Sequence, residues 1–230
     1  MEQAPDAVAI LAERNAALRF EHLPVSTVLS TKRLILDLLG IAYPGFAARA
    51  VPELHSVLTA TYGAGGNARI WGSAGRLPAP EAALLNSAAA HALDFDDTHD
   101  RACLHAGASV VPAALAMADQ LGGISGREFI TAVVAGVEWM CRMGVATRIP
   151  PNASGWMYTA LYAYFGATAA TSRLLGLDAS ATIDAMGIAY GQAAGNTQCM
   201  PDGALSKRLQ PGFGARAGVL SALLARSGIS

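Results

Sequence analysis

A cluster of ionisable and hydroxyl side chains interrupts a chain that is otherwise rich in alanine, leucine, glycine and valine. Residues 94–99 read Asp-Phe-Asp-Asp-Thr-His, and residues 105–109 read His-Ala-Gly-Ala-Ser. Acidic side chains are costly to bury unless they are paired or hydrogen-bonded. So many titratable groups between two apolar segments predict a site that takes a proton from, or gives one to, a small anionic molecule.

Spacing assigns the first roles within this cluster. Asp94, Asp97 and Thr98 lie at positions i, i+3 and i+4, which share one face of a helix, and we expect that helix to run through Asp97. Asp96 is expected to point elsewhere and to cap or pair structurally. His105 then lies in the turn before the next helix, whose free N–H groups would attract an anion. Histidine acts as an acid or a base near neutrality.

A second candidate corner lies at residues 206–212, which read Ser-Lys-Arg-Leu-Gln-Pro-Gly. Lys207 precedes another expected helix N-terminus. An ammonium group suits a carboxylate or a phosphate, and the helix end adds partial positive charge. Two such corners facing each other would hold a compact di- or tricarboxylate. We therefore expect His105 and Lys207 to meet around one shared hollow.

Plainer interpretations exist for most of these groups. Aspartates at a helix end are often solvated, and His91 and His99 are more simply structural or surface groups. The helical spacing of Tyr158, Tyr162 and Phe165 is that of a core stripe. A magnesium site of the aspartate-rich type needs a second acidic segment, and zinc needs closely spaced His or Cys ligands. The chain lacks both patterns, so we expect no metal.

Composition limits the class of protein. The chain has 230 residues, of which 53% are hydrophobic and 14% charged, and its net charge is −1. It is long enough for a sizeable core, and without a Lys/Arg run we expect no nucleic-acid partner. We also expect no membrane span and no signal peptide. Three separated cysteines, an odd number, indicate reduced thiols and a cytoplasmic location; they are Cys103, Cys141 and Cys199.

The apolar period is helical almost throughout, which predicts an all-α fold in a single domain over residues 1–230. Ser125 and Glu128 fit a capping box. Ser109 and Asp178 are expected N-caps, and Pro211 is expected to open a helix. A long loop, with a short strand at 68–71, is expected over 67–80. Because the chain stops just after a helix, we also expect it to be part of a larger polypeptide. The predicted helices are 7–20, 26–39, 47–62, 81–97, 109 onward, 125–143, 155–175, 178–194 and 212–226.

Several segments, in order, resemble the MmgE/PrpD family; they are residues 86–98, 105–112, 172–178, 185–189 and 207–218. The family includes 2-methylcitrate dehydratases, cis-aconitate decarboxylases and an iminodisuccinate epimerase. The resemblance implies a large all-helical domain, a smaller lid domain with the active site between the two, and a homodimer. This chain resembles the N-terminal helical portion, with the lid domain absent from it.

The resemblance also implies site residues, because Asp94, Thr98, His105 and Lys207 match active-site positions of the decarboxylase branch. Two positions depart from the pattern. Residue 157 is Met where the family often has His before Pro-Thr, and residue 210 is Gln where Lys-x-Leu-His is common. Methionine cannot move a proton, and glutamine cannot act as a general base. A tyrosine at 158 or 162 is a candidate replacement donor.

The favoured hypothesis is a lyase- or isomerase-type enzyme domain that acts on a small polycarboxylate by proton transfer, without a cofactor. Dehydration, decarboxylation and epimerisation all remain open, since each can pass through a carbanion-like state. His105 would transfer the proton, Asp94 would orient a partner and Thr98 would hydrogen-bond the substrate. The expected binding residues are Lys207, Gly107 and Tyr158. The alternative is a non-catalytic helical dimerisation module or a truncated, inactive paralogue.

Overall fold

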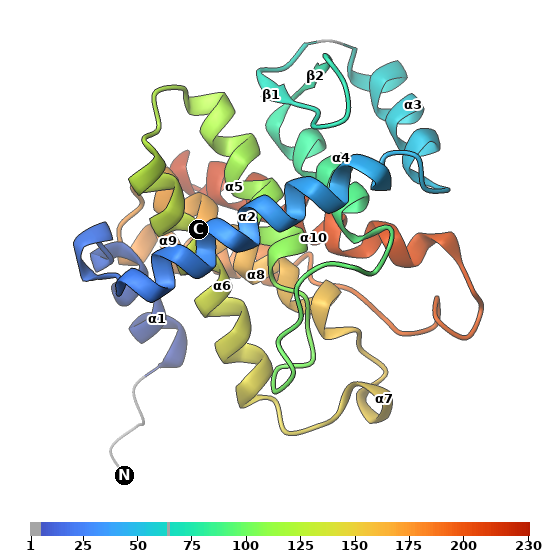
Figure 1. Cartoon of the computed structure of the whole chain (residues 1–230). Coiled ribbons are helices and arrows are strands. Elements are labelled where there is room, and N and C mark those ends of the chain that lie inside the picture. Colours follow the sequence, from blue (N-terminus) through green and yellow to red (C-terminus); the bar gives the residue numbers. More distant parts are fainter. Residues whose placement is uncertain (1–5, 64) are drawn as a thin grey trace.

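The computed structural model describes residues 6–63 and 65–230, which form an almost wholly helical domain (Figure 1). The predicted all-α fold is confirmed. The elements, in chain order, are α1 (Ala7–Ala17), η1 (Phe20–His22), α2 (Val25–Gly45), α3 (Val51–Tyr62), β1 (Ala68–Arg69), β2 (Arg76–Leu77), α4 (Ala79–His91), α5 (Gly107–Leu121), α6 (Gly126–Ala146), α7 (Pro151–Ser154), α8 (Tyr158–Leu174), α9 (Ala179–Tyr190), η2 (Leu205–Leu209) and α10 (Gln210–Arg226).

Helix starts follow local side-chain chemistry. The Ser125 hydroxyl accepts from the Glu128 N–H while the Glu128 carboxylate accepts from the Ser125 N–H, so the predicted capping box at the start of α6 is confirmed. Asp178 caps α9 by accepting from Ala181 N–H, and Pro211 lies in the first turn of α10. The contacts of Ser125 and Asp178 satisfy N–H groups that a helix leaves free at its start, and Pro211 has no N–H group that would need a partner there.

Two predicted helix ends differ from the structure by more than the others. The helix expected to stop at Gly40 continues to Gly45 as α2, because Ala42 and Gly45 are buried and this packing outweighs the weak helix propensity of glycine. A Cβ at Gly45 would fall 2.0 Å from the carbonyl oxygen of Ala89 in α4. The helix expected to run through Asp97 ends at His91, and this difference reshapes the site.

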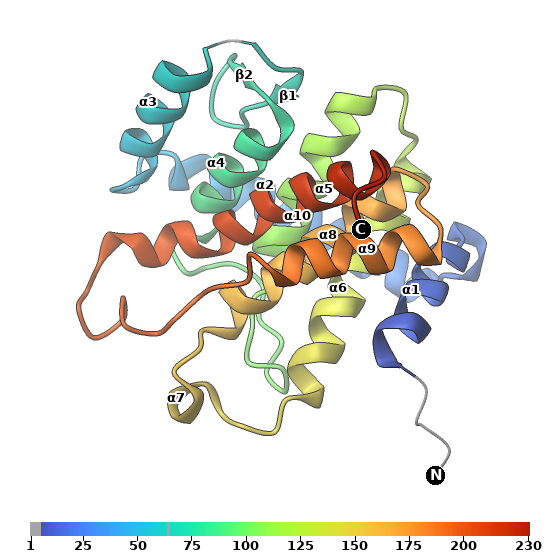
Figure 2. The same cartoon turned by 180° about the vertical axis from the view of Figure 1, so that it is seen from behind.

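Helices α8 and α10 pack along each other at the centre, with α9 on one side, as the view from behind shows (Figure 2). Their contact is made by very small residues. A Cβ on Gly214 would lie 2.4 Å from the Ala163 Cβ, and one on Gly218 would lie 2.5 Å from the Ala167 Cβ. Both distances are far below an ordinary contact between carbon atoms, so hydrogen is the only side chain that these two positions accept.

The predicted loop region contains a two-stranded antiparallel sheet, in which Ala68 pairs with Leu77 and Arg69 pairs with Arg76. The strand expected at 68–71 is shorter than predicted, since β1 covers two residues. Arg69 joins this sheet to α5 by donating to the Asp119 carboxylate from its backbone and its guanidinium.

Helix α6 bears on the expectation of no membrane span. It is the one helix, in the part of the chain that the structure describes, that is long and apolar enough to cross a bilayer by length and composition. Half of its 18-residue apolar window is buried inside the domain. The core helices of water-soluble proteins meet the same criterion.

Candidate active site

The loop after α4 and the 3-10 helix η2 bring Asp94 and Lys207 together. Asp94 has a φ of 54°, a left-handed conformation that ends the helical path and is tolerated by aspartate more than by most residues. The Lys207 ammonium donates to both oxygens of the Asp94 carboxylate. Burial raises the pKa of Asp94, but the hydrogen bond from Lys207 and nearby positive charges outweigh it, so that the pKa is lowered overall.

A hollow of about 460 Å³ opens beside this ion pair, and we call it the Lys207 hollow. Its volume is in the range of small-molecule sites. The lining comes from the loop after α4, the segment before η2 and η2 itself. The lining residues are Ala92, Leu93, Asp94, Cys199, Met200, Gly203, Ala204, Leu205, Lys207 and Arg208.

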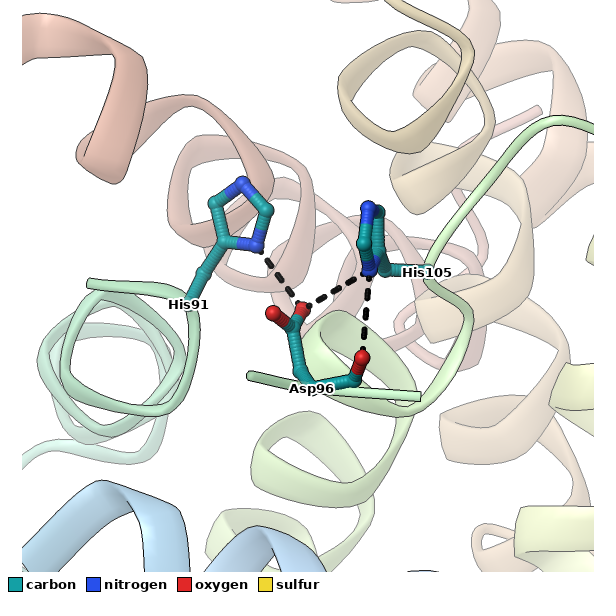
Figure 3. Close-up of side chains that lie close together, drawn as sticks. All are labelled: His91, Asp96 and His105. Atoms are coloured by element: carbon teal, nitrogen blue, oxygen red, sulfur yellow. Dashed lines mark hydrogen bonds and ion pairs between the residues drawn. The ribbon is translucent and has the colours of Figure 1, made fainter. Parts of the chain in front are cut away.

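Asp96 lies between two imidazoles (Figure 3). Its Oδ2 atom is 2.8 Å from His91 Nδ1 and 3.5 Å from His105 Nδ1, and its backbone carbonyl oxygen is 3.4 Å from the same His105 nitrogen. The Asp96 side chain is fully buried and that of His91 is 1% exposed, whereas that of His105 is 26% exposed. The expectation that Asp96 points away from the site is wrong, because the helix ends early and the loop turns this carboxylate inward.

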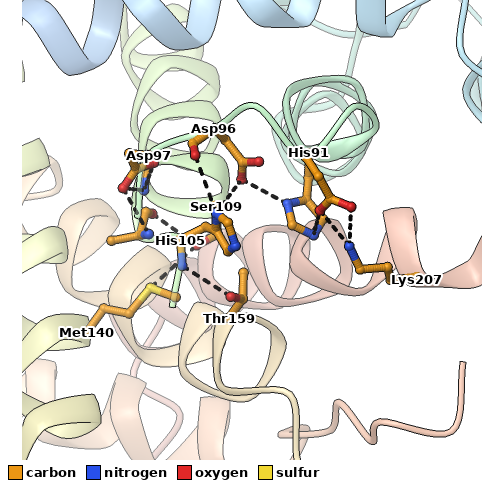
Figure 4. Close-up of polar contacts among 11 residues, drawn as sticks. His91, Asp96, Asp97, His105, Ser109, Met140, Thr159 and Lys207 are labelled. Atoms are coloured by element: carbon orange, nitrogen blue, oxygen red, sulfur yellow. Dashed lines mark hydrogen bonds and ion pairs between the residues drawn. The ribbon is translucent and has the colours of Figure 1, made fainter. Parts of the chain in front are cut away.

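His91 connects the Asp94–Lys207 ion pair to Asp96. Its Nε2 atom lies 3.7 Å from the Asp94 Oδ1 atom, while its Nδ1 atom bonds Asp96. One continuous line of polar contacts therefore runs through Lys207, Asp94, His91, Asp96 and His105, and we call it the polar row. Figure 4 labels Lys207, His91, Asp96 and His105 of this row. The prediction that His105 and Lys207 meet around one shared hollow is wrong, because His105 is not among the residues lining the Lys207 hollow. The polar row joins the two residues through side chains instead.

Asp97 occupies the position that the sequence assigned to a substrate. Its carboxylate accepts from the backbone N–H groups of Ala106, at 3.1 Å, and Gly107, at 2.9 Å. The prediction that Gly107 offers a free N–H group to a carboxylate ligand is therefore wrong. The predicted N-cap at Ser109 is also wrong, because α5 begins at Gly107. Burial raises the pKa of Asp97, and the bonds from Gly107 and Ala106 only partly oppose it.

Two further predicted residues lie outside the polar row. Thr98 is exposed, and its hydroxyl bonds no residue within 6–63 and 65–230. Tyr158 is 4% exposed, and its hydroxyl donates to the Ile149 carbonyl oxygen, which holds it in the core. Thr159 contacts the site instead, since its hydroxyl accepts from the His105 N–H at 3.1 Å.

The two positions that depart from the family pattern have structural roles here. Met157 is 8% exposed, and its backbone N–H donates to the Gly195 carbonyl oxygen. The Gln210 amide donates to the Asn196 carbonyl oxygen and to the Cys199 sulfur, and Cys199 lines the Lys207 hollow. Gln210 therefore supports one wall of the hollow through Cys199.

Sequence reasoning missed His91, Asp96 and Thr159 as parts of the site. A weak signal was available for the first two, since a histidine five residues before an aspartate at a helix end can pair with it once the helix stops between them.

The same two residues and His105 offer ligand atoms within 4.8 Å of one another. Two of these atoms, His91 Nδ1 and Asp96 Oδ2, lie 2.8 Å apart, which is the distance of a direct hydrogen bond between them. The expectation of no metal stays a prediction.

Comparison with known proteins identifies the family of this helical domain. Residues 9–230 match the MmgE/PrpD N-terminal domain, and the chain belongs to this family. Cis-aconitate decarboxylase of Aspergillus terreus is 37% identical over an alignment of 220 residues, which covers 92% of this chain and 44% of that protein. The cis-aconitate decarboxylase-like protein oryM of Aspergillus oryzae is 35% identical over 220 residues, 92% of this chain and 45% of that protein. Human cis-aconitate decarboxylase is 30% identical over 226 residues, 92% of this chain and 44% of that protein. The chain thus spans less than half the length of these relatives.

Proposed function

We propose that this domain supplies the carboxylate-binding and proton-transferring groups of a lyase that acts on a small di- or tricarboxylate. The polar row carries this proposal, because it joins a cation at the edge of a hollow to a partly exposed imidazole. The relatives are named cis-aconitate decarboxylases, so cis-aconitate is the substrate that we propose to test first.

Lys207 is the residue that we assign to a substrate carboxylate. Its ammonium lines the Lys207 hollow and has Asp94 as its present partner. An incoming carboxylate would share the ammonium with Asp94 or take its place, and a point charge with three donors suits this exchange. The neighbouring Arg208 also lines the hollow, and one of its guanidinium nitrogens donates to the Arg49 carbonyl oxygen.

His105 is the residue that we assign to proton transfer. In a decarboxylation, the carbon–carbon bond to one carboxyl group breaks and carbon dioxide leaves. The electron pair left on the substrate is delocalised, and one carbon then takes up a proton. Dehydration and epimerisation need a proton removed from carbon instead, and one positioned imidazole serves either direction. The role of Thr98 in hydrogen-bonding the substrate stays a prediction.

The chain itself offers a matched pair of lysines for the test. It contains two lysines, Lys207 in the site and Lys32 on α2, so isotope-labelled lysine gives two side-chain signals. Titration with cis-aconitate should move the Lys207 signal and leave the Lys32 signal in place. Calorimetry should give a millimolar or tighter Kd that is lost in Lys207→Ala and kept in Lys32→Ala. Unchanged binding in Lys207→Ala would refute the assignment.

Turnover is measured on the same samples by NMR in D₂O, which detects carbon dioxide loss, water addition or elimination, and deuterium exchange on carbon. His105→Ala should remove whichever reaction occurs, while its Kd for cis-aconitate stays within a few-fold of the unsubstituted chain, since Lys207 is unchanged. Reaction at an undiminished rate in His105→Ala would remove the proton-transfer role. A chain that binds no citrate-like acid supports the alternative of a non-catalytic helical module.

A further inference from the structure

We propose that Asp96 is the positioning residue of this site, and that it holds His105 in the tautomer with its hydrogen on Nδ1. The Nε2 atom of His105 is then the one that exchanges a proton with the substrate. This inference rests on the proposed function, in which His105 transfers the proton. It adds the buried carboxylate that selects the reactive nitrogen, and it includes His91 as a second partner of that carboxylate.

The surroundings of His105 Nδ1 support this assignment. The two atoms that the nitrogen faces are Asp96 Oδ2, at 3.5 Å, and the Asp96 carbonyl oxygen, at 3.4 Å. Both atoms accept hydrogen bonds, so a neutral imidazole here carries its hydrogen on Nδ1 and leaves a lone pair on Nε2. The contacts are long, as catalytic hydrogen bonds often are without substrate. The backbone N–H of His105 donates to the Thr159 hydroxyl, which fixes the backbone that carries the ring.

His91 keeps the Asp96 carboxylate in place. Its Nδ1 atom is 2.8 Å from the same Oδ2 atom that faces His105, and the two rings meet edge to face with centroids 5.3 Å apart. Among the described residues, two polar atoms of this pair are buried without a hydrogen-bond partner, namely Asp96 Oδ1 and His91 Nε2, although the latter lies 3.7 Å from Asp94 Oδ1. Buried polar atoms are normally paired, and such exceptions are expected where a carboxylate is kept for function rather than for stability.

The proposal makes a specific prediction for Asp96→Asn. The variant amide has one oxygen and one NH₂ group in the volume of the carboxylate. If the NH₂ group takes the Oδ2 position, its two hydrogens can reach both imidazole Nδ1 atoms, and the oxygen takes the Oδ1 position, which has no partner in either case. In the opposite orientation the NH₂ group would be buried without an acceptor, which is unfavourable. The Asp96 carbonyl oxygen, 3.4 Å from His105 Nδ1, is kept in the variant. Asp96→Asn should therefore shift the His105 tautomer equilibrium from the Nδ1–H form toward the Nε2–H form.

The readout is the tautomer itself, followed by long-range ¹H–¹⁵N correlation of the histidine rings at pH 8, above the ordinary histidine pKa of about 6.5. The chain has five histidines, and His105→Gln assigns the relevant signal. We expect the Nδ1–H form in the unsubstituted chain and a larger share of the Nε2–H form in Asp96→Asn. Asp97→Asn is the matched control, because this neighbouring carboxylate bonds the backbone N–H groups of Ala106 and Gly107 and no imidazole. This variant should leave the tautomer unchanged.

Kinetics with cis-aconitate give the second readout. Asp96→Asn should lower kcat by about 10²–10⁴-fold, the usual contribution of a general acid or base. Its KM should change by less than about threefold, because binding through Lys207 is separate from this step. A purely structural role would instead change kcat and KM together, or change neither while the protein becomes less stable.

Three outcomes would overturn the inference. They are the Nε2–H form of His105 in the unsubstituted chain, an unchanged tautomer in Asp96→Asn, and an unchanged kcat in that variant. The first needs no variant, so the inference stays falsifiable if Asp96→Asn does not fold. The tautomer measurement also needs no turnover. A chain that fails to react with cis-aconitate but shows the predicted tautomers would therefore contradict the proposed function and leave the role of Asp96 in place.

Discussion

Removing the Asp97 carboxylate should destabilise the domain at a position that the sequence assigned to a ligand. In Asp97→Ala the N–H groups of Ala106 and Gly107 lose their acceptor. A charge-assisted bond contributes about 1.5–3 kcal/mol, and the loss of a helix cap costs about 0.5–2 kcal/mol. Both values describe the same hydrogen bonds, so they are not added together. Burial offsets part of the gain, as the raised pKa of Asp97 indicates, so we expect a loss of about 2 kcal/mol.

Urea and thermal unfolding followed by circular dichroism measure this loss. For a chain of this length, about 2 kcal/mol corresponds to a decrease of about 4–8 °C in Tm.

A small carboxylate ion should fill the space left in Asp97→Ala, since a helix N-terminus binds anions. Sodium formate should therefore raise the Tm of Asp97→Ala more than that of the unsubstituted chain. Sodium chloride at the same concentration is the control.

The dependence on pH has a definite sign. Burial raises the pKa of Asp97 in the folded chain, while the unfolded value is about 3.9. The stability contributed by this group is then fully present below the unfolded pKa and is lost as pH rises through the folded pKa. The effect of Asp97→Ala should accordingly be larger at pH 4 than at pH 7. Equal stability of the two proteins at both pH values, or an equal formate effect on both, would refute the capping role.

The remaining predictions concern packing and thiol reactivity. Gly218→Ala should lower the free energy of unfolding by about 1–3 kcal/mol, because its Cβ would overlap Ala167. The control Gly187→Ala, also within a helix, meets no atom within 4 Å and should stabilise the domain by about 0.5–1 kcal/mol; urea unfolding that ranks the two variants the other way contradicts the packing account. Burial raises the pKa of the Cys141 thiol to about 11, so iodoacetamide at pH 8 should label it at least about tenfold more slowly than the exposed Cys103. Peptide mass spectrometry measures both rates, and equal rates would show that Cys141 is not held in a buried environment.

Local sequence signals predicted the parts of the fold that depend on neighbours along the chain. The capping box at Ser125 and the cap at Asp178 use residues within three positions, and both are confirmed. The all-α class followed from a period that runs through the whole chain. These signals do not depend on which helices pack together, so they hold before any tertiary contact forms.

The site depends on contacts that no local pattern contains. Asp94 leaves the helical path and pairs with Lys207, 113 residues away, and the turn of the backbone then decides where the next carboxylates point. As a result Asp96 and Asp97 have roles opposite to those predicted, since Asp96 joins the polar row and Asp97 caps α5. Homodimer formation, a cytoplasmic location and the absence of a nucleic-acid partner stay predictions.

The close approach of α8 and α10 has a consequence for reading an alignment of relatives of this chain. A larger side chain at Gly214 or Gly218 would overlap α8, so a replacement at either position requires the two central helices to move apart. These positions should therefore vary as little among relatives as a residue that touches substrate does. Invariance by itself would not separate the two kinds of constraint, whereas His105 differs from the glycines in being partly open to solvent. Screening invariant positions for solvent access and hydrogen-bonding capacity would remove both glycines and keep His105.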